Sequence, residues 1–564
     1  MFLIGVIFFL PPAVFAQPPA SQEMSGQEQA RELIDKDEKL RKEVEAKIKA
    51  PEVENKIPDE AFAKAPTQKI KITNIVVAGA TILSEEEIQK ITTPFKGQDL
   101  DLSGMQQVAE RVTEAYRKKG YITSRAYLPP QKIENGVLEL RVLEATMGEL
   151  TVKGNRFFRS RLYSRSIDLK KGQPFNYNKL KRGLVDINER PDRFARAVLV
   201  PGKEAGTTDV VLEAKDNLPI HLGLSYDDFA SRYVNRNRYT TTLTDNNLTG
   251  FGDVLTAQYQ LADAEDYVLN SLRYLFPVTR SLDVGFYWSR SKLSLGREYQ
   301  DVMARGKSKI FSLYATQTLI KQDNVILKLN GGFDYKNIFN FQLGVESSRD
   351  IMRVAKIGLD LDVTDKFGRT LITEEFNSGI PNIFGGLDAK DPRSSRAGAG
   401  GQFIKNNVNI LRLQKMPFNS NILWKNQLQF SPYTLTATEQ FQLGGISNLR
   451  GYPPAEYVGD QGYAMSWDWS FPPYFIPKKV KIPYLKDSVY DALRFVAFYD
   501  WGNVRLRKPQ AGEHKNKTIR DYGCGVRLNL MNNFSARYEL AWPLDTTPSD
   551  GKHLHQWIEV SKTF

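Results

Sequence analysis

The second half of the chain is built from alternating apolar and polar residues. From residue 219 to residue 564, short segments place an apolar or aromatic residue at every second position and a polar or small residue between. In one segment the apolar series is Tyr463, Met465, Trp467, Trp469 and Phe471, and the residues between are Ala464, Ser466, Asp468 and Ser470. A period of two is that of a β-strand with two different faces. About sixteen such segments of roughly ten residues fit into 219–564, which predicts a large antiparallel β structure.

Two architectures produce this alternation. In a soluble sandwich the apolar face is the core, whereas in a membrane barrel the apolar face meets lipid and the polar face lines water. Residues 219–564 are too many for one ordinary sandwich, and strands of about ten residues cross a bilayer when tilted. The last alternating strand ends in an aromatic residue, Phe564, which resembles the recognition signal of bacterial outer-membrane barrels. We therefore predict a membrane β-barrel of about 16 antiparallel strands over 219–564, with a lumen that strand side chains do not fill.

An internal repeat precedes the barrel. Gly79 matches Gly154 and residues 96–98 match residues 171–173, both at an offset of 75, while 143–145 match 212–214 at an offset of 69. Each copy opens with a strand-like run, continues with a helical stretch and closes with two strand-like runs. The apolar face of the first helical stretch consists of Met105, Val108, Val112, Ala115 and Tyr116. The repeat predicts two small α/β domains, at 69–146 and 147–218, whose exposed sheet edges can pair with an extended foreign chain.

The N-terminal residues predict export and a mobile helix. Residues 1–16 form a short apolar run that ends in a small-residue pattern, as in a cleaved signal peptide; a retained anchor or a misassigned start is the alternative. Residues 17–50 are mostly polar and helix-forming, with a thin apolar stripe at Leu33, Leu40, Val44 and Ile48. Such a helix either lies loose in solvent or crosses a water-filled lumen, and a wide barrel favours its use as a plug. The proline-containing residues 51–68 predict a semi-extended linker.

Composition excludes several classes of protein. The 77 Lys+Arg and 65 Asp+Glu residues give a net charge of +12, and charged residues make up 25% of the chain, which excludes wholesale disorder. A mean hydropathy of −0.41 excludes a polytopic helical membrane protein. One cysteine excludes a disulfide framework, and four histidines without motif context predict neither a metal site nor a cofactor. We find no catalytic arrangement and expect no enzyme. The second repeat carries 15 basic against 9 acidic residues over 149–218, which is either a solvated face or a surface for anionic lipid or an acidic client.

A long segment between the eleventh and twelfth predicted strands carries the most specific motif. Residues 434–462 contain Arg450-Gly451-Tyr452, framed by Gly-Gly and Pro-Pro pairs. This motif resembles the loop signature of the two-partner secretion outer-membrane transporters, the TpsB family of the BamA-like superfamily. Residues 498–502 resemble the family's F-x-D-x-G strand motif. By alternation Phe498 and Asp500 face the lumen, so an inward-folded loop can place Arg450 against Asp500; Asp468, also inward, is a second candidate acceptor.

The resemblance covers the whole chain and implies a function. It implies two POTRA domains in the periplasm, a 16-stranded barrel in the bacterial outer membrane, and export of a large secreted partner exoprotein (TpsA-like) by two-partner, type Vb, secretion. The POTRA domains are then expected to capture the unfolded client. Outer-membrane lipid and, through Phe564, the barrel-assembly machinery are further expected partners, and nucleic acid is not. A BamA-like insertase with the same plan is the alternative, although two POTRA units and a long N-terminal helix favour export.

Overall fold

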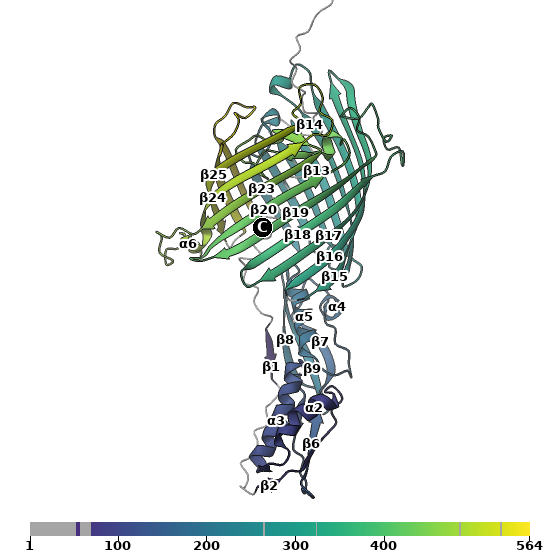
Figure 1. Cartoon of the computed structure of the whole chain (residues 1–564), viewed down its shortest axis with the longest axis vertical. Helices are drawn as coiled ribbons and strands as arrows, with labels where there is room; N and C mark the ends of the chain where they lie inside the picture. The colour runs from purple at the N-terminus through teal and green to yellow at the C-terminus, as the bar shows by residue number, and fades with distance from the viewer. Residues whose placement is uncertain are drawn as a thin grey trace, which may run out of the picture. The chain divides into compact units, whose positions relative to one another are not determined.

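The computed structural model describes residues 52–56 and 69–564, apart from 263–265, 323, 484, 486, 531 and 532 (Figure 1). The predicted signal peptide (1–16), the predicted plug helix (17–50) and most of the predicted linker (51–68) lie outside the described residues. The described chain divides into two compact parts. One comprises the residues up to 219 together with 249–252 and holds two small α/β units, and the other contains the barrel.

The barrel is a closed sheet of sixteen antiparallel strands. Neighbouring strands in sequence are neighbours in the sheet, and the first and last strands close it along a ladder from Gly223↔Thr563 to Asp227↔Glu559. The predicted fold class is thereby confirmed. The strands are β10 (Ile220–Asp227), β11 (Arg238–Asp245), β12 (Val254–Ala262), β13 (Tyr267–Pro277), β14 (Leu282–Ser294), β15 (Arg305–Lys321), β16 (Val325–Gln342), β17 (Val345–Asp365), β18 (Gly368–Gly379), β19 (Phe403–Met416), β20 (Ser420–Phe430), β23 (Gln461–Phe471), β24 (Leu493–Arg505), β25 (Asn516–Leu530), β26 (Phe534–Pro543) and β27 (His555–Thr563).

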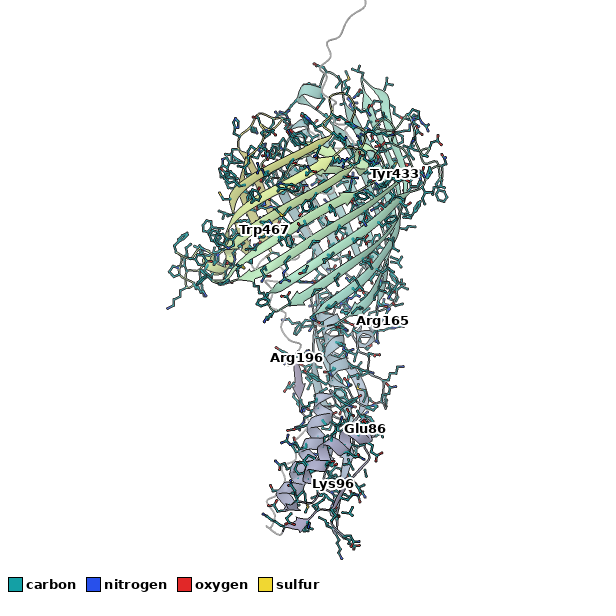
Figure 2. The ribbon with its side chains drawn as sticks, viewed as in Figure 1. Glu86, Lys96, Arg165, Arg196, Tyr433 and Trp467 are labelled. Atoms are coloured by element: carbon teal, nitrogen blue, oxygen red, sulfur yellow. The ribbon has the colours of Figure 1, made fainter. Side chains whose placement is uncertain are left out.

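The polarity of the strand faces separates a membrane barrel from a soluble sandwich. On β23 the aromatic side chains of Trp467 and Trp469 are 46% and 48% exposed, and Figure 2 shows Trp467 on the outer wall. The acidic side chains of Asp468 and Asp500, which belong to the opposite face, are fully buried. A soluble protein would reverse this arrangement, because it buries its large apolar groups. The outer surface is therefore suited to lipid. Among the described residues no helix is both long and apolar enough to cross a bilayer.

The first α/β unit packs two helices on a short sheet. Its central strand β6 pairs with β3 in parallel and with β5 in antiparallel orientation, and β2 pairs with β4. Helix α3 begins after an Asp101 N-cap and buries its predicted apolar face, including Val108, Val112 and Tyr116. The elements are β2 (Ile70–Lys71), β3 (Asn74–Ala78), α2 (Glu85–Thr92), η1 (Thr93–Phe95), β4 (Asp99–Leu100), α3 (Leu102–Lys118), β5 (Arg125–Tyr127) and β6 (Val137–Leu143).

The second α/β unit repeats this plan. Its elements are β7 (Thr146–Lys153), α4 (Ser160–Ser166), α5 (Tyr177–Asn188), β8 (Arg193–Pro201) and β9 (Thr207–Asp216), and β9 is the central strand between β7 and β8. The offset of 75 holds in the backbone: Ile72 N–H donates to Gln98 C=O at 2.9 Å, and Met147 N–H donates to Gln173 C=O at 2.7 Å. Gly79 and Gly154 both have positive φ, and a Cβ on either would meet a carbonyl oxygen of the central strand.

The match of Leu143-Glu144-Ala145 to residues 212–214 is wrong by three residues. A Cβ on Gly79 would meet Val142 O, and one on Gly154 would meet Ala214 O, so the last strands correspond at an offset of 72. The structural counterpart of Glu144 is therefore Asp216, not Glu213. A sequence comparison can misalign two strands in this way, because short apolar-acidic-apolar patterns recur along them.

The second sheet has an additional strand from the N-terminal side of the chain. β1 (Val53–Asn55) pairs in parallel with the outer edge of β8, from Val53↔Ala197 to Asn55↔Leu199. Ala197 N–H donates to Glu52 C=O at 3.1 Å and Lys56 N–H donates to Leu199 C=O at 3.0 Å. Part of the predicted linker is thus a strand rather than a free extended chain.

Candidate functional site

The segment between β20 and β23 folds into a hairpin. η5 (Ala437–Glu439) leads into β21 (Phe441–Leu443), which pairs with β22 (Tyr457–Gly459). At its turn, Asn448 Oδ1 accepts the N–H of Gly444 at 3.0 Å, and Asn448 Nδ2 donates to Gln442 C=O at 2.9 Å. The N–H of Gly445 donates to Tyr452 C=O at 2.9 Å and closes the turn. The closed turn presents Arg450 at the tip.

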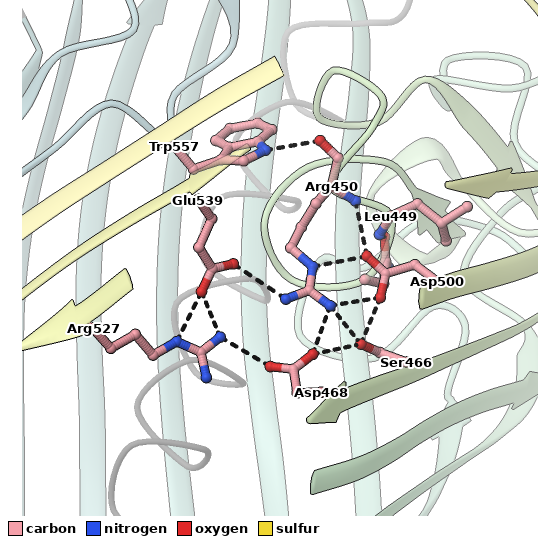
Figure 3. Close-up of polar contacts among 9 residues, drawn as sticks. Leu449, Arg450, Ser466, Asp468, Asp500, Arg527, Glu539 and Trp557 are labelled. Atoms are coloured by element: carbon pink, nitrogen blue, oxygen red, sulfur yellow. Dashed lines mark hydrogen bonds and ion pairs between the residues drawn. The ribbon is translucent and has the colours of Figure 1, made fainter. Parts of the chain in front are cut away.

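The guanidinium of Arg450 contacts the carboxylates of three barrel strands (Figure 3). It donates to Asp500 through Nε (2.8 Å to Oδ2) and Nη2 (2.7 Å to Oδ1), which is a two-pronged contact. Nη2 also donates to Asp468 Oδ1 at 2.6 Å, and Nη1 donates to Glu539 Oε2 at 3.1 Å. The guanidinium carbon lies 3.4 Å from the ring centroid of Phe498. Only arginine has planar donors that reach three acids and stack on a ring at the same time.

A second arginine continues the network (Figure 3). Arg527 on β25 donates from Nη2 to Asp468 Oδ2 at 2.9 Å and from Nε to Glu539 Oε1 at 2.8 Å. Ser466 donates to Asp500 Oδ1 at 2.6 Å and accepts from Arg450 Nη2 at 2.9 Å. Three carboxylates therefore share two guanidinium groups, and the acids depend on both arginines for charge compensation.

Each of the other two motif residues has its own physical reason. A Cβ on Gly451 would lie 2.5 Å from Asp521 Cβ and 3.0 Å from the Pro543 nitrogen, so only glycine allows the tip to approach the wall. The side chain of Tyr452 is fully buried in an apolar cluster that includes Leu449 and Ile519. Glycine thus permits the approach, tyrosine packs the turn, and arginine supplies the charge.

The tip also reaches the strands that close the barrel. Trp557 Nε1, on the last strand β27, donates to the backbone carbonyl of Arg450 at 2.8 Å. The indole packs with Ile446 of the tip and with Phe229, which follows the first strand. One turn therefore contacts residues on both sides of the closing strand pair.

Two further charged contacts hold the base of the hairpin, one on each side. Glu439 receives Lys336 Nζ at 2.8 Å and Lys405 Nζ at 2.7 Å. Asp460 receives Arg396 Nη1 at 2.7 Å and the N–H groups of Leu435 and Arg507, each at 2.8 Å. The hairpin is thus fixed at its base by two buried acids and at its tip by its own arginine.

The structure brings together every residue that the sequence singled out for this site. The sequence predicted Asp500 as the first and Asp468 as the second candidate partner of Arg450. In the structure Arg450 contacts both. Sequence reasoning missed Glu539, Arg527 and Trp557. Arg527 and Glu539 stand on the polar side of the alternation of their strands, which indicates that they face the lumen but not which residue they meet. Among the described residues no group of three or more His, Cys, Asp or Glu side chains could hold a metal ion.

Both the barrel and the first α/β unit match known protein families. The family model described as haemolysin secretion/activation protein ShlB/FhaC/HecB matches residues 206–528, and the model of the ShlB-type POTRA domain matches residues 70–145. The heme/hemopexin transporter protein HuxB of Haemophilus influenzae is 22% identical over 499 residues, covering 85% of this chain and 84% of that protein. The outer membrane transporter CdiB of Escherichia coli is 25% identical over 490 residues, covering 83% and 80%.

Solved structures show the same fold. CdiB from Escherichia coli superposes with a TM-score of 0.74 at 20% identity, covering 98% of this chain and 100% of that one. BamA from Haemophilus ducreyi, solved without its first three POTRA domains, reaches 0.53 at 14% identity, covering 88% and 100%.

Proposed function

Because the chain belongs to the haemolysin secretion/activation protein family ShlB/FhaC/HecB, we propose that its α/β units capture an unfolded partner exoprotein and pass it to the barrel. The chain is an outer-membrane transporter of two-partner secretion, with its POTRA region in the periplasm as in its relatives. The family match favours export over a BamA-like insertase, since the BamA likeness concerns the fold alone.

The β1–β8 pairing supports capture by strand addition. The outer edge of β8 offers N–H and C=O groups to an extended segment, and the chain's own residues 52–56 use them. Val53 packs against the core of the unit, while Glu54 lies on the side of Arg196. An extended client segment could pair with β8 in place of residues 52–56. It would need an apolar residue at the position of Val53 and an acidic residue at the position of Glu54.

The clamp at Arg450 gives the hairpin a resting position inside the barrel. Ordering so long a segment costs conformational entropy, and buried charge pairs offset that cost. We assign the predicted site residues Arg450, Gly451, Tyr452, Phe498, Asp468 and Asp500 to this anchoring role. Phe564 serves recognition by the barrel-assembly machinery, and we assign no catalytic step to the chain.

The capture model is tested with a secreted partner exoprotein of the TpsA type as client, produced together with the transporter. Ala197→Pro removes the N–H that β8 offers to an added strand. In the parallel ladder with β1 this N–H points away from β9, so the hydrogen bonds between β8 and β9 are kept. Lys56→Pro removes a donor from β1 and leaves β8 intact. We expect Ala197→Pro to lower periplasmic crosslinking and secretion of the client about tenfold, and Lys56→Pro to maintain or raise crosslinking. Equal behaviour of the two variants would contradict capture at this edge.

A further inference from the structure

The connection between β23 and β24 is long for its end of the barrel. In an antiparallel barrel alternate connections lie at the same end, and this connection shares the end at which β10 begins after the α/β units. The other connections at that end occupy 246–253, 278–281, 322–324, 366–367, 417–419 and 531–533, whereas this one occupies 472–492. Periplasmic turns of outer-membrane barrels are usually short. The length of the 472–492 connection therefore indicates a role beyond joining two strands.

Residues 472–492 form a folded hairpin. An isolated antiparallel bridge joins Lys481 to Ser488, Ile482 N–H donates to Asp487 C=O at 3.0 Å, and Val489 N–H donates to Val480 C=O at 2.9 Å. The short helix α6 (Val489–Ala492) leads back into β24. In Figure 1 the segment beside α6 leaves the side of the barrel wall. We call residues 472–492 the basic hairpin.

An aromatic row joins the lipid-facing wall to the basic hairpin. Phe471, the last residue of β23, has its ring centroid 4.9 Å from that of Trp469. Its centroid lies 6.2 Å from that of Tyr474, and the rings of Phe471 and Tyr474 are nearly parallel, at 8°. Phe475 lies 6.0 Å from Phe495 of β24. Tyr474 and Phe475 are 52% and 77% exposed. The apolar surface that suits lipid on the strands therefore continues onto the hairpin.

Exposed lysines follow directly after these rings. Lys478, Lys479 and Lys481 are exposed, and Lys478 Nζ lies 5.1 Å from the ring centroid of Tyr490. By sequence, residues 472–492 carry four lysines against Asp487 and Asp491, and Asp487 is buried. Aromatic rings beside lysines are the pattern of a segment that lies at a membrane surface, with rings at headgroup depth and ammonium groups on phosphates.

We propose that the basic hairpin binds the anionic phospholipid headgroups of the periplasmic leaflet. Tyr474 and Phe475 insert beside the acyl boundary, and Lys478, Lys479 and Lys481 contact the phosphates. A docked periplasmic protein is the competing occupant, but continuity of the ring row with Trp469 and Phe495 favours lipid, since a protein partner would need no extension of the lipid-facing wall. The hairpin holds this part of the barrel rim at the membrane surface.

The test titrates the full-length transporter in detergent with phosphatidylglycerol and, separately, with phosphatidylethanolamine, and counts bound lipid by native mass spectrometry. Lys478→Glu, Lys479→Glu and Lys481→Glu are combined in one variant. A matched variant reverses three exposed basic residues at the opposite end of the barrel, Arg507, Lys508 and Lys515. Heat-modifiability of the barrel checks folding in both.

We expect the hairpin variant to bind phosphatidylglycerol at least roughly tenfold more weakly, with phosphatidylethanolamine little changed, because each lysine near an anionic surface contributes attraction. The opposite-end variant should bind both lipids as the wild type does. Phe475→Ser should weaken both lipids alike, because the ring inserts regardless of headgroup charge. An unchanged phosphatidylglycerol preference in the hairpin variant overturns the proposal, and a loss of secretion without a change in lipid binding assigns the hairpin to a protein instead.

Discussion

A carboxylate fixes a turn both in the barrel lumen and in the α/β units, but the two settings differ. In the lumen Asp500, fully buried, receives the cationic side chain of Arg450. In the first α/β unit Glu144, partly exposed, receives the N–H groups of Thr81 and Ile82 and the hydroxyl of Tyr116. In the second unit Asp216 does the same for residues 156–158 and for the Tyr163 hydroxyl.

The difference lies in what remains when one partner is removed. Loss of Arg450 leaves Asp500 without its cation and leaves Asp468 and Glu539 with Arg527. Breaking a buried charge pair costs about 3–5 kcal/mol. Loss of Glu144 leaves backbone N–H groups that water reaches. We therefore expect loss of Arg450 to release the tip of the hairpin, whereas the carboxylate anchors of the α/β units add modest stability to a fold that its core already specifies.

Arg450→Ala should have the largest effect. The tip loses its guanidinium contacts to Asp500, Asp468 and Glu539, and we expect secretion of the client to fall at least about tenfold although the protein still reaches the outer membrane. Arg450→Lys should restore only part of the activity, because an ammonium group cannot reproduce the planar fork. Secretion yield is measured with heat-modifiability as the folding control.

Asp500→Asn sharpens the same comparison. It leaves Arg450 with Asp468 and Glu539 and removes one acid from a cluster in which acids outnumber arginines, so its effect should be smaller than that of Arg450→Ala. The double variant should be less impaired than the sum of the two, because Asp500 no longer stands without its cation. Strictly additive losses would show that the two residues act independently.

Removing the carboxylate anchors of the α/β units, Glu144 and Asp216, should have an intermediate effect. The effect should be a loss of local stability. Glu144→Gln and Asp216→Asn each replace charge-assisted acceptors, worth about 1–3 kcal/mol. Hydrogen exchange of the full-length protein should show faster local opening at 79–84 and at 155–158, with Asp216→Asn the stronger because three N–H groups depend on it. An effect spread over the whole unit would mean that the carboxylate supports the core instead.

The pH dependence of this anchor follows from its surroundings. Burial alone would raise the pKa of Glu144, but hydrogen bonds from Thr81, Tyr116 and Ile82 outweigh burial and hold that pKa below its usual value. A lowered folded pKa means that the stabilisation is complete above the unfolded value of about 4.3 and disappears as pH falls through the folded value. Protection of 79–84, corrected for intrinsic exchange, should fall over that range in the wild type and stay flat in Glu144→Gln.

The sequence predicts the barrel well because lipid enforces its pattern. Each strand that separates lipid from a polar interior must alternate, so the series at 463–471 marks both faces without any knowledge of the partner strands. The repeat is also visible, because Gly79 and Gly154 occupy backbone positions that tolerate no Cβ. The β1 strand is not visible, since residues 53–55 carry no strand signal and pair only because β8 offers an edge.

The sequence predicts the site only in part, because contacts across a lumen depend on the height of each residue along the barrel axis. Alternation places Asp468, Asp500 and Glu539 on the inner face, but the height of each depends on strand register and tilt. The family motif supplied the pairing of Arg450 with Asp500. Nothing of that kind indicated Trp557, whose indole donates to a backbone carbonyl of the tip and leaves no charge pattern in the sequence.

Glu213→Gln should have the smallest effect, and it tests the correspondence between the two units. Glu213 is the residue that sequence alignment at an offset of 69 equates with Glu144, yet its carboxylate contacts only the side chain of Arg196, at 2.6 Å, among the contacts described, and both side chains are more than two-fifths exposed. Exposed ion pairs contribute little, because solvent screens them and ordering two long side chains costs entropy. We therefore expect Glu213→Gln to leave hydrogen exchange at 155–158 unchanged while Asp216→Asn accelerates it. If Glu213→Gln opened that turn as much as Asp216→Asn does, the offset of 72 would fail as the structural alignment, and the shared carboxylate anchor of the two units with it.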